Sequence, residues 1–458
     1  MSDAKTGMKP CARPFLAAAK DFASGKDTPR AFLERCLAET DAREKDILAY
    51  VATNIEGARA AADASSQRWR DGRPLSPIDG MPVGIKDVIE TADMPTGMGS
   101  PLYDGWSPGH DAASVHALRE AGAVIVGKTV TTEFAASEPG PTRNPWDTSR
   151  TPGGSSSGSA AGVAAGYFSA ALGTQVIGSI LRPSSYCGVI GYKPTFGTIN
   201  RGGSHDYMSQ SSQGVIAASL DDCWQAAWEI SQRCGGDPGY GGLAGPASLP
   251  QAPAPKTLVL LETAGWAEAS DEAKTRMLEA AESLRAAGIS VLTRKDSADI
   301  EAAEQALVEC MGISRTVNAW ESRWPLNTYR DRDAAKLSKA MYDRSLEAEA
   351  MNLDDYRKAI ARRAEIRAVY ARLAGIADCC ITLAASAAAP VGLRSTGSAL
   401  FAVTSSMLGA PSLSLPVLQE EGLPLGMQVI GFDNRDAHAF AVSHSILNTL
   451  DPARAVRA

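Results

Sequence analysis

One stretch of the chain, residues 151–193, constrains the fold more than any other. It reads TPGGSSSGSAAGVAAGYFSAALGTQVIGSILRPSSYCGVIGYK and carries two serine-bearing glycine turns, at 153–158 and at Gly178-Ser179. The small residues between them, 159–171, lose little side-chain entropy in a tightly packed helix, and 170–176 reads as a strand. Glycines around a serine let the backbone approach a ligand and direct N–H groups at it. The stretch therefore predicts a site in which Ser179 is an activated nucleophile.

A serine hydroxyl needs a base before it can attack a carbonyl carbon. The chain contains five histidines, all distant in sequence from the glycine turns: His110, His116, His205, His438 and His444. Lys86, in contrast, lies in an apolar, strand-like segment, 82–88. Burial lowers the pKa of a lysine until its neutral amine can serve as a base. The sequence therefore favours a serine–lysine pair.

Four motifs, GIKD, GGSSSGSAAGVAAG, GTQVIGSILRPSSYCG and GYKPTFG, occur in one order along the chain. With them, most of residues 10–445 resembles the amidase signature family, and the Q-x-x-G-S-x-x-R-P variant resembles its malonamidase-like members. The resemblance implies a single α/β domain over 1–458, with a mixed, mostly parallel sheet covered by helices on both faces. We expect 10–234 to carry the catalytic motifs, 255–400 to form a variable, largely helical substrate side, and 401–450 to return to the sheet and end in a helix.

The resemblance also implies a Ser–cis-Ser–Lys triad. Ser179 matches the nucleophile, Ser155 matches a bridging serine that follows a cis peptide bond, and Lys86 matches the base. The family's oxyanion hole matches the backbone N–H groups of Val176, Ile177, Gly178 and Ser179. Two further hydroxyls match groups that orient the triad, those of Ser157 and Thr174.

The chain departs from the usual family pattern next to the nucleophile. Gln175 stands for an acid, Ile177 for a glycine and Leu181 for an arginine, while Arg182 follows one residue later. In the malonamidase-like members the matching arginine holds a substrate carboxylate, and a guanidinium can grip a carboxylate in bidentate fashion. Two interpretations of Arg182 stay open, a carboxylate clamp and a structural ion pair.

Two other motifs predict nothing further. Residues 122–129, GAVIVGKT, satisfy the P-loop pattern, but Ala-Val-Ile-Val favours a strand over a loop around phosphate. The G-x-S-x-G of 154–158 lacks the preceding strand of a nucleophile elbow.

A Gly- and Ser-rich segment, 195–214, predicts loops around the site, with an exposed His205 beside Asp206.

The sequence thus predicts hydrolysis of a linear amide through an acyl-enzyme on Ser179, without a metal or organic cofactor. Arg182 favours a small acid amide. The aromatic and Met residues of 91–111 and 310–351, either pocket lining or core, favour a bulkier aryl amide or a carbamate. A third hypothesis is a subunit of an amidotransferase that modifies misacylated tRNA.

Composition restricts the partners. The chain has a net charge of −7 and 44% apolar residues, and so lacks the excess of positive charge that binds nucleic acid or an anionic membrane. No run approaches the roughly 18 apolar residues of a membrane span. The eight cysteines lack metal-ligand spacing, and Cys379-Cys380 reads as a reduced core pair. We therefore expect a cytoplasmic enzyme with a small-molecule substrate; monomer and homodimer stay open.

Overall fold

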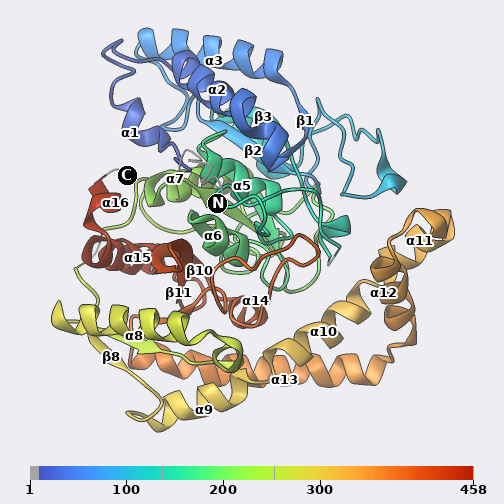
Figure 1. Cartoon of the computed structure of the whole chain (residues 1–458), viewed down its shortest axis with the longest axis vertical. Helices are drawn as coiled ribbons and strands as arrows, with labels where there is room; N and C mark the ends of the chain where they lie inside the picture. The colour runs from blue at the N-terminus through green and yellow to red at the C-terminus, as the bar shows by residue number, and fades with distance from the viewer. Residues whose placement is uncertain (1–9, 137, 252, 457–458) are drawn as a thin grey trace, which may run out of the picture.

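One sheet runs through the whole molecule. The computed structural model describes residues 10–136, 138–251 and 253–456. Within these ranges eleven strands form the sheet in the order β1-β3-β2-β4-β6-β5-β10-β11-β9-β7-β8, with helices packed around it (Figure 1). The strands are β1 (Tyr50–Thr53), β2 (Pro82–Lys86), β3 (Val124–Thr129), β4 (Ala170–Gln175), β5 (Ile190–Lys193), β6 (Ser212–Ala217), β7 (Thr257–Leu260), β8 (Ser290–Leu292), β9 (Cys379–Leu383), β10 (Ser412–Glu420) and β11 (Leu423–Ile430).

The predicted α/β class with a mixed sheet is confirmed, although less of the sheet is parallel than expected. Parallel pairing is confined to β3-β2-β4 and β9-β7-β8. The other described neighbours pair antiparallel. The strand β6, part of which was predicted as loop, enters between β4 and β5. Glu421 and Gly422 both have positive φ, which closes β10 and β11 into a tight hairpin.

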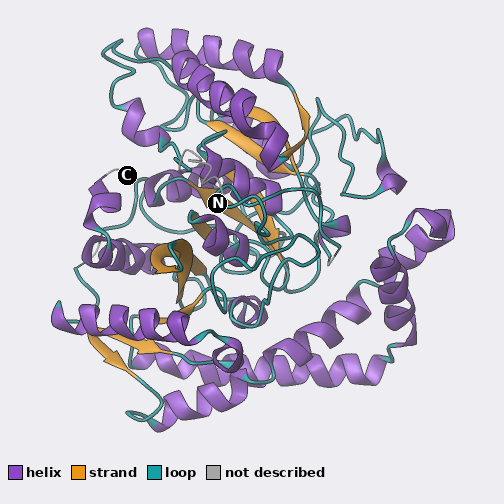
Figure 2. Ribbon diagram, viewed as in Figure 1, coloured by secondary structure: helices purple, strands orange, loops and turns teal. Residues whose placement is uncertain are grey.

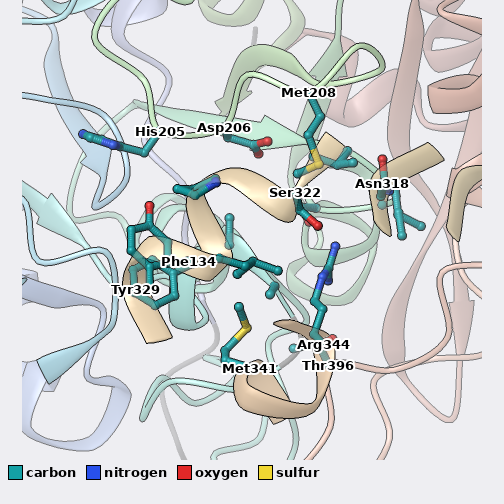
Figure 3. A pocket seen from close by; sticks show the side chains of 18 of the residues that line it. Phe134, His205, Asp206, Met208, Asn318, Ser322, Tyr329, Met341, Arg344 and Thr396 are labelled. Atoms are coloured by element: carbon teal, nitrogen blue, oxygen red, sulfur yellow. The ribbon is translucent and has the colours of Figure 1, made fainter. Parts of the chain in front are cut away.

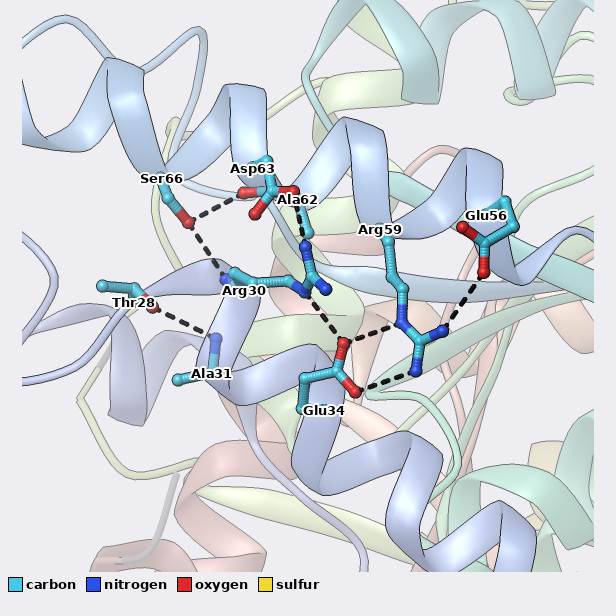
Figure 4. Close-up of polar contacts among 9 residues, drawn as sticks. All are labelled: Thr28, Arg30, Ala31, Glu34, Glu56, Arg59, Ala62, Asp63 and Ser66. Carbon is cyan, nitrogen blue, oxygen red and sulfur yellow. Dashed lines mark hydrogen bonds and ion pairs between the residues drawn. The ribbon is translucent and has the colours of Figure 1, made fainter.

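The first long helix begins at a capping threonine followed by a proline. Thr28 Oγ1 accepts a hydrogen bond of 3.1 Å from the Ala31 N–H, and Pro29 occupies the first position of α2 (Pro29–Ile47). On the adjoining face, Glu34 accepts hydrogen bonds from Arg30 and Arg59, which joins α2 to α3 (Ile55–Arg70; Figure 4).

The start of α3 is fixed by a capping side chain. The segment 51–53 before it belongs to β1 and pairs with β3. The helix begins at Ile55 because the Asn54 side chain accepts from the Gly57 N–H and so caps it. The segment 124–129 of the P-loop-like motif is strand β3, as predicted.

Small residues let two short helices pack tightly against the sheet. Every residue of α5 (Ser157–Ala165) and α6 (Leu181–Cys187) is buried. A Cβ added to Gly158 would lie 2.2 Å from the Ala49 carbonyl oxygen, so no larger side chain fits there. The helix α5 ends at Gly166, which has positive φ, earlier than the predicted 171.

The second half of the chain adds β7, α8 (Asp271–Ala286) and β8 as a βαβ unit. Beyond it, α10 (Cys310–Glu321), α11 (Arg323–Asp333), α12 (Lys339–Ala350) and α13 (Leu353–Ala371) form an arm that projects from the body; Figure 2 shows it as almost entirely helical. The remaining helices of eight or more residues are α4 (Ala113–Glu120), α7 (Leu220–Cys234), α9 (Ala298–Leu307) and α15 (Asp436–Leu450). The shorter ones are α1 (Phe15–Ala19), α14 (Ala402–Leu408) and α16 (Pro452–Val456). Because α16 follows α15, the prediction that the helix ending at 450 is the last one was wrong.

The helices α10 and α13 pack into a core cluster of the body, and α11 and α12 touch the body through a smaller apolar cluster. Leu326 and Tyr329 of α11 and Met341 of α12 pack with Leu102 of the 3-10 helix η1 (Pro101–Tyr103). Cys379 and Cys380 are both unpaired and buried in β9, as predicted. Across the described ranges, none of the helices combines the length and apolarity needed to cross a membrane.

Candidate active site

Lys86 ends the buried strand β2 and is itself fully buried. Its Nζ lies 2.7 Å from Ser155 Oγ and donates a hydrogen bond of 2.7 Å to Thr174 Oγ1 on β4. Burial lowers the pKa of Lys86 to about 7, against a smaller opposing effect of the Asp206 carboxylate. The parallel pairing of β2 and β4 brings together Lys86 and Thr174, which are 88 residues apart in sequence.

Ser155 lies in the glycine turn that precedes α5. The Gly154–Ser155 peptide bond is cis, as the family resemblance implied. Ser155 is 2% exposed, and its hydroxyl faces the amine of Lys86. Ser157, at the start of α5, donates instead to the Val130 carbonyl at 3.2 Å, so its part in orienting the triad stays a prediction.

Ser179 follows β4 in a turn that leads into α6. The Ser156 N–H donates to the Ser179 carbonyl oxygen at 3.3 Å, which holds the two glycine turns side by side. The side chain of Ser179 is partly exposed and lines a cavity. No hydrogen bond joins the Ser155 and Ser179 hydroxyls among the described residues, so this second step of the relay belongs to the proposal below.

The turn between β4 and α6 presents free backbone donors. None of the N–H groups of Val176, Ile177, Gly178 and Ser179 has an acceptor among the described residues, and all four residues line the same cavity. Adjacent unpaired N–H groups form a concave site for negative charge. The arrangement can stabilise an oxyanion that develops beside Ser179.

Gln175, which replaces the acid of the family pattern, holds this turn in shape. Its Oε1 accepts from the N–H groups of Ile180 and Leu181, at 2.8 and 3.0 Å. Its Nε2 donates to Ser406 Oγ, which in turn donates to the Ile177 carbonyl, each at 2.9 Å. An amide can accept and donate at once, so Gln175 meets both needs without a buried charge.

Arg182 lies 8% exposed on α6 and supports the same turns. Its Nη1 donates to the Gly397 carbonyl at 2.7 Å, and its Nη2 donates to the Gly154 carbonyl at 2.6 Å. Burial lowers the pKa of its guanidinium. Neither of its partners is a carboxylate, so the structural ion pair expected as the alternative role is absent among the described residues.

A cavity of about 190 Å³ opens beside Ser179. Aromatic and apolar side chains form much of its wall: Phe134, Val176, Ile177, Met208, Pro325, Leu326, Tyr329 and Met341. The Phe134 and Tyr329 rings stack at a centroid distance of 4.2 Å (Figure 3). The arm therefore supplies one wall of the cavity, and the turns around Ser179 supply another.

A family model described as amidase matches residues 31–439. The chain belongs to the amidase family. The match runs from α2 to α15 and so includes Lys86, Ser155 and Ser179.

Known relatives of this amidase differ in the length they share with it. A glutamyl-tRNA(Gln) amidotransferase subunit of Chloroflexus aggregans is 43% identical over 221 residues, 47% of this chain and 43% of that protein. The match thus spans less than half the length of that curated relative. A crystal structure of an amidase superposes with a TM-score of 0.83 at 26% identity, covering 95% of this amidase and 100% of that chain. The native peptide amidase of Stenotrophomonas maltophilia superposes with a TM-score of 0.73 at 25% identity, covering 98% and 97%.

Some residues of the amidase that were considered as pocket lining turn out to be core. Met94 and Met98 are buried in the main core, and Tyr103 and Trp106 pack against it. The aromatic and Met residues of the arm have different environments: Tyr329 and Met341 line the cavity, whereas Trp324 and Tyr342 are exposed.

The loop 204–211 lines the cavity, as predicted for the segment 195–214, but His205 is less exposed than expected. His205 is half-buried, and its Nε2 lies 3.0 Å from Glu90 Oε1. Asp206 is 3% exposed, and its Oδ1 accepts from Ser211 Oγ at 2.8 Å. The sequence also missed Phe134, Arg344 and Thr396 as lining residues, since no motif marks them. Within the described ranges no three His, Cys, Asp or Glu side chains are grouped to hold a metal ion.

Proposed function

We propose that this amidase hydrolyses a linear amide through a covalent acyl-enzyme on Ser179, with Lys86 as the base and Ser155 as the proton relay. The 2.7 Å contact between Lys86 Nζ and Ser155 Oγ carries the proposal. With a pKa of about 7, much of Lys86 is uncharged near neutral pH. Thr174 Oγ1 takes one N–H, which leaves the nitrogen lone pair for the Ser155 hydroxyl.

The proposed reaction has two halves. Lys86 takes the proton of Ser155 while Ser155 takes the proton of Ser179, and Ser179 Oγ bonds to the amide carbon. The proton returns through Ser155 to the leaving nitrogen as the C–N bond breaks. Water, activated by the same relay, then attacks the ester and releases the acid and free Ser179.

The negative charge of the tetrahedral intermediate falls in the turn 176–179. Its unpaired N–H groups support the role of an oxyanion hole. In a well-studied protease, loss of one such donor costs about 10²–10³ in kcat. The turn thus supplies catalysis through backbone groups, which is compatible with Ile177 in the place of a glycine.

The cavity walls support an aryl amide or an aryl carbamate as substrate, the bulkier of the two predicted classes. The stacked Phe134 and Tyr329 rings offer an apolar, aromatic surface beside Ser179. A carbamate presents the same developing oxyanion as an amide, so the triad serves both. Because two backbone carbonyls engage Arg182, we assign it the positioning of the Gly154–Ser155 turn instead of a carboxylate clamp.

A substrate panel on the purified protein tests the proposal. We expect hydrolysis of acetanilide and of ethyl N-phenylcarbamate, and slower hydrolysis of malonamate. Ser179→Ala is expected to abolish all turnover. Mass spectrometry of a quenched wild-type reaction should find one acyl group on the peptide that carries Ser179. Full turnover by Ser179→Ala would refute the mechanism.

A second candidate function is that of an amidotransferase component, and the match to the glutamyl-tRNA(Gln) amidotransferase of Chloroflexus aggregans favours it. Such a protein would release ammonia from an amide donor for use by a partner. The measurement that separates the two is ammonia release from glutamine by the isolated chain. Efficient turnover of acetanilide with no turnover of glutamine, with or without partner subunits, would exclude the transferase.

A further inference from the structure

A second arginine, Arg344, lines the cavity from α12. It is half-buried, and none of the described residues forms a hydrogen bond or ion pair with it. The carboxylates of Glu347 on α12 and of Asp206 on the cavity wall act on its charge from a distance, but neither forms an ion pair with it among the described residues. A partly buried guanidinium that donates no hydrogen bond is unfavourable until a ligand accepts from it.

The opposite wall carries the opposite charge. Asp206 lies across the cavity, and its Oδ2 is buried without a hydrogen-bond partner among the described residues (Figure 3). In the part of the chain that the structure describes, Arg344 and Asp206 do not form an ion pair with each other. The cavity therefore has a cationic end at Arg344 and an anionic end at Asp206, and this polarity favours one orientation of a charged substrate.

Aromatic and apolar side chains line the cavity together with Arg344 and Ser179. Tyr329 and Phe134 stack there, and Met341 lies one helical turn before Arg344 on α12. A ligand anion that reaches Arg344 must therefore sit on a body that tolerates aromatic contact. Arg182, the other arginine of the cavity, already donates to two carbonyls.

We propose that Arg344 is the receptor for a carboxylate carried on the aromatic or apolar body of the substrate. The inference rests on the proposed function, since the amide must lie at Ser179 while the carboxylate lies at Arg344. A guanidinium donates two parallel N–H groups to a carboxylate, which gives direction as well as charge. The preferred substrates are then anionic aryl amides, and an ammonium at the same place is disfavoured.

Turnover of matched probes tests the assignment. The neutral probe is acetanilide, 4-acetamidobenzoate carries a carboxylate on the leaving side, and succinanilate carries one on the acyl side. We expect wild type to show at least a tenfold higher kcat/KM for one carboxylate probe than for acetanilide. In Arg344→Met the ratio of kcat/KM for the carboxylate probe to kcat/KM for acetanilide falls at least tenfold, chiefly because KM for the carboxylate probe rises. Arg344→Lys keeps part of this preference. The side on which the carboxylate is preferred gives the orientation of the amide.

Arg330→Met is the matched control, because it removes one arginine charge from the same arm at a residue outside the cavity. It is expected to keep the carboxylate preference. An unchanged ratio in Arg344→Met, or an equal loss for neutral and anionic probes, overturns the inference.

Binding separates this inference from the proposed function. Calorimetry with 4-acetamidobenzoate and succinanilate is expected to give a Kd in Ser179→Ala that Arg344→Met in the same background weakens at least tenfold. This result would uphold Arg344 as the receptor even if no probe were hydrolysed. Absence of hydrolysis would instead refute the proposed function. Equal binding with and without the arginine, or no binding, would refute the receptor.

Discussion

Arg182 Nη2 donates a hydrogen bond of 2.6 Å to the carbonyl oxygen of Gly154, the residue that precedes Ser155. The second terminal nitrogen of Arg182 holds the carbonyl of Gly397 on a separate loop. One buried guanidinium thus fixes the turn that presents Ser155 to Lys86. This geometry makes Arg182 a positioning residue whose loss should affect every substrate alike.

The first prediction concerns Arg182→Ala. We expect kcat to fall by at least tenfold for neutral and anionic substrates in equal proportion, and the melting temperature to fall. The physical reason is the loss of two hydrogen bonds from a charged donor, each worth about 1.5–3 kcal/mol. Steady-state kinetics with acetanilide and malonamate, together with thermal unfolding, measure both effects. A loss restricted to malonamate would restore Arg182 as the carboxylate clamp.

The second prediction concerns pH. The base must be uncharged to accept a proton, and burial lowers the pKa of Lys86 to about 7. We therefore expect kcat/KM to rise about tenfold per pH unit below 7 and to level off above it. A profile from pH 5.5 to 9 with acetanilide measures this.

Asp206→Asn supplies the control for that profile. The Asp206 carboxylate raises the pKa of Lys86, so its removal should move the midpoint of the acidic limb to lower pH. Lys86→Met is expected to abolish the pH-dependent activity. An unshifted midpoint in Asp206→Asn would assign the limb to another group.

The sequence predicted the catalytic half of the molecule better than the arm, for a physical reason. Around Ser155 and Ser179 the backbone packs so closely that only small residues fit, as at Gly158. The residue types are therefore restricted, and the sequence pattern reveals the site. The same restriction made the strands carrying Lys86 and Thr174 predictable.

The cavity wall could not be predicted in this way. Phe134, Tyr329 and Arg344 come from three separate segments, and only tertiary packing brings them together. Any residue that fits a helix face is compatible with α11 and α12, so nothing local distinguishes Tyr329, which lines the cavity, from Tyr342, which is exposed. Antiparallel β6 was missed for a similar reason, because its first residues, Ser212-Gln213-Gly214, have weak strand propensity.

The third prediction concerns Gln175→Met. This change keeps the length of the side chain but leaves the N–H groups of Ile180 and Leu181 without their acceptor. An unsatisfied buried donor costs about 1–3 kcal/mol. We expect a lower melting temperature and at least a tenfold loss of kcat, since the turn 176–179 loses its support.

Ser406→Ala is the matched control for Gln175. It removes only the hydroxyl that links Gln175 Nε2 to the Ile177 carbonyl and keeps the acceptor for the two N–H groups. We expect a smaller loss of stability and of kcat than in Gln175→Met. Equal losses in the two variants would mean that the link to Ser406, and not the capping of Ile180 and Leu181, supports the turn.

The fourth prediction concerns the aromatic wall. Tyr329→Leu keeps an apolar side chain but removes the ring that stacks on Phe134 at 4.2 Å. An aromatic pair contributes about 0.5–1.5 kcal/mol beyond its buried area, and an aryl substrate that lies against this wall would lose a contact of that size. We expect KM for acetanilide to rise about three- to tenfold while KM for butyramide changes less than twofold. Tyr342→Leu, at an exposed position of α12, serves as the control and should leave both values unchanged. If Tyr329→Leu raised KM equally for the aryl and the alkyl amide, the stacked rings would shape the cavity without contacting the substrate.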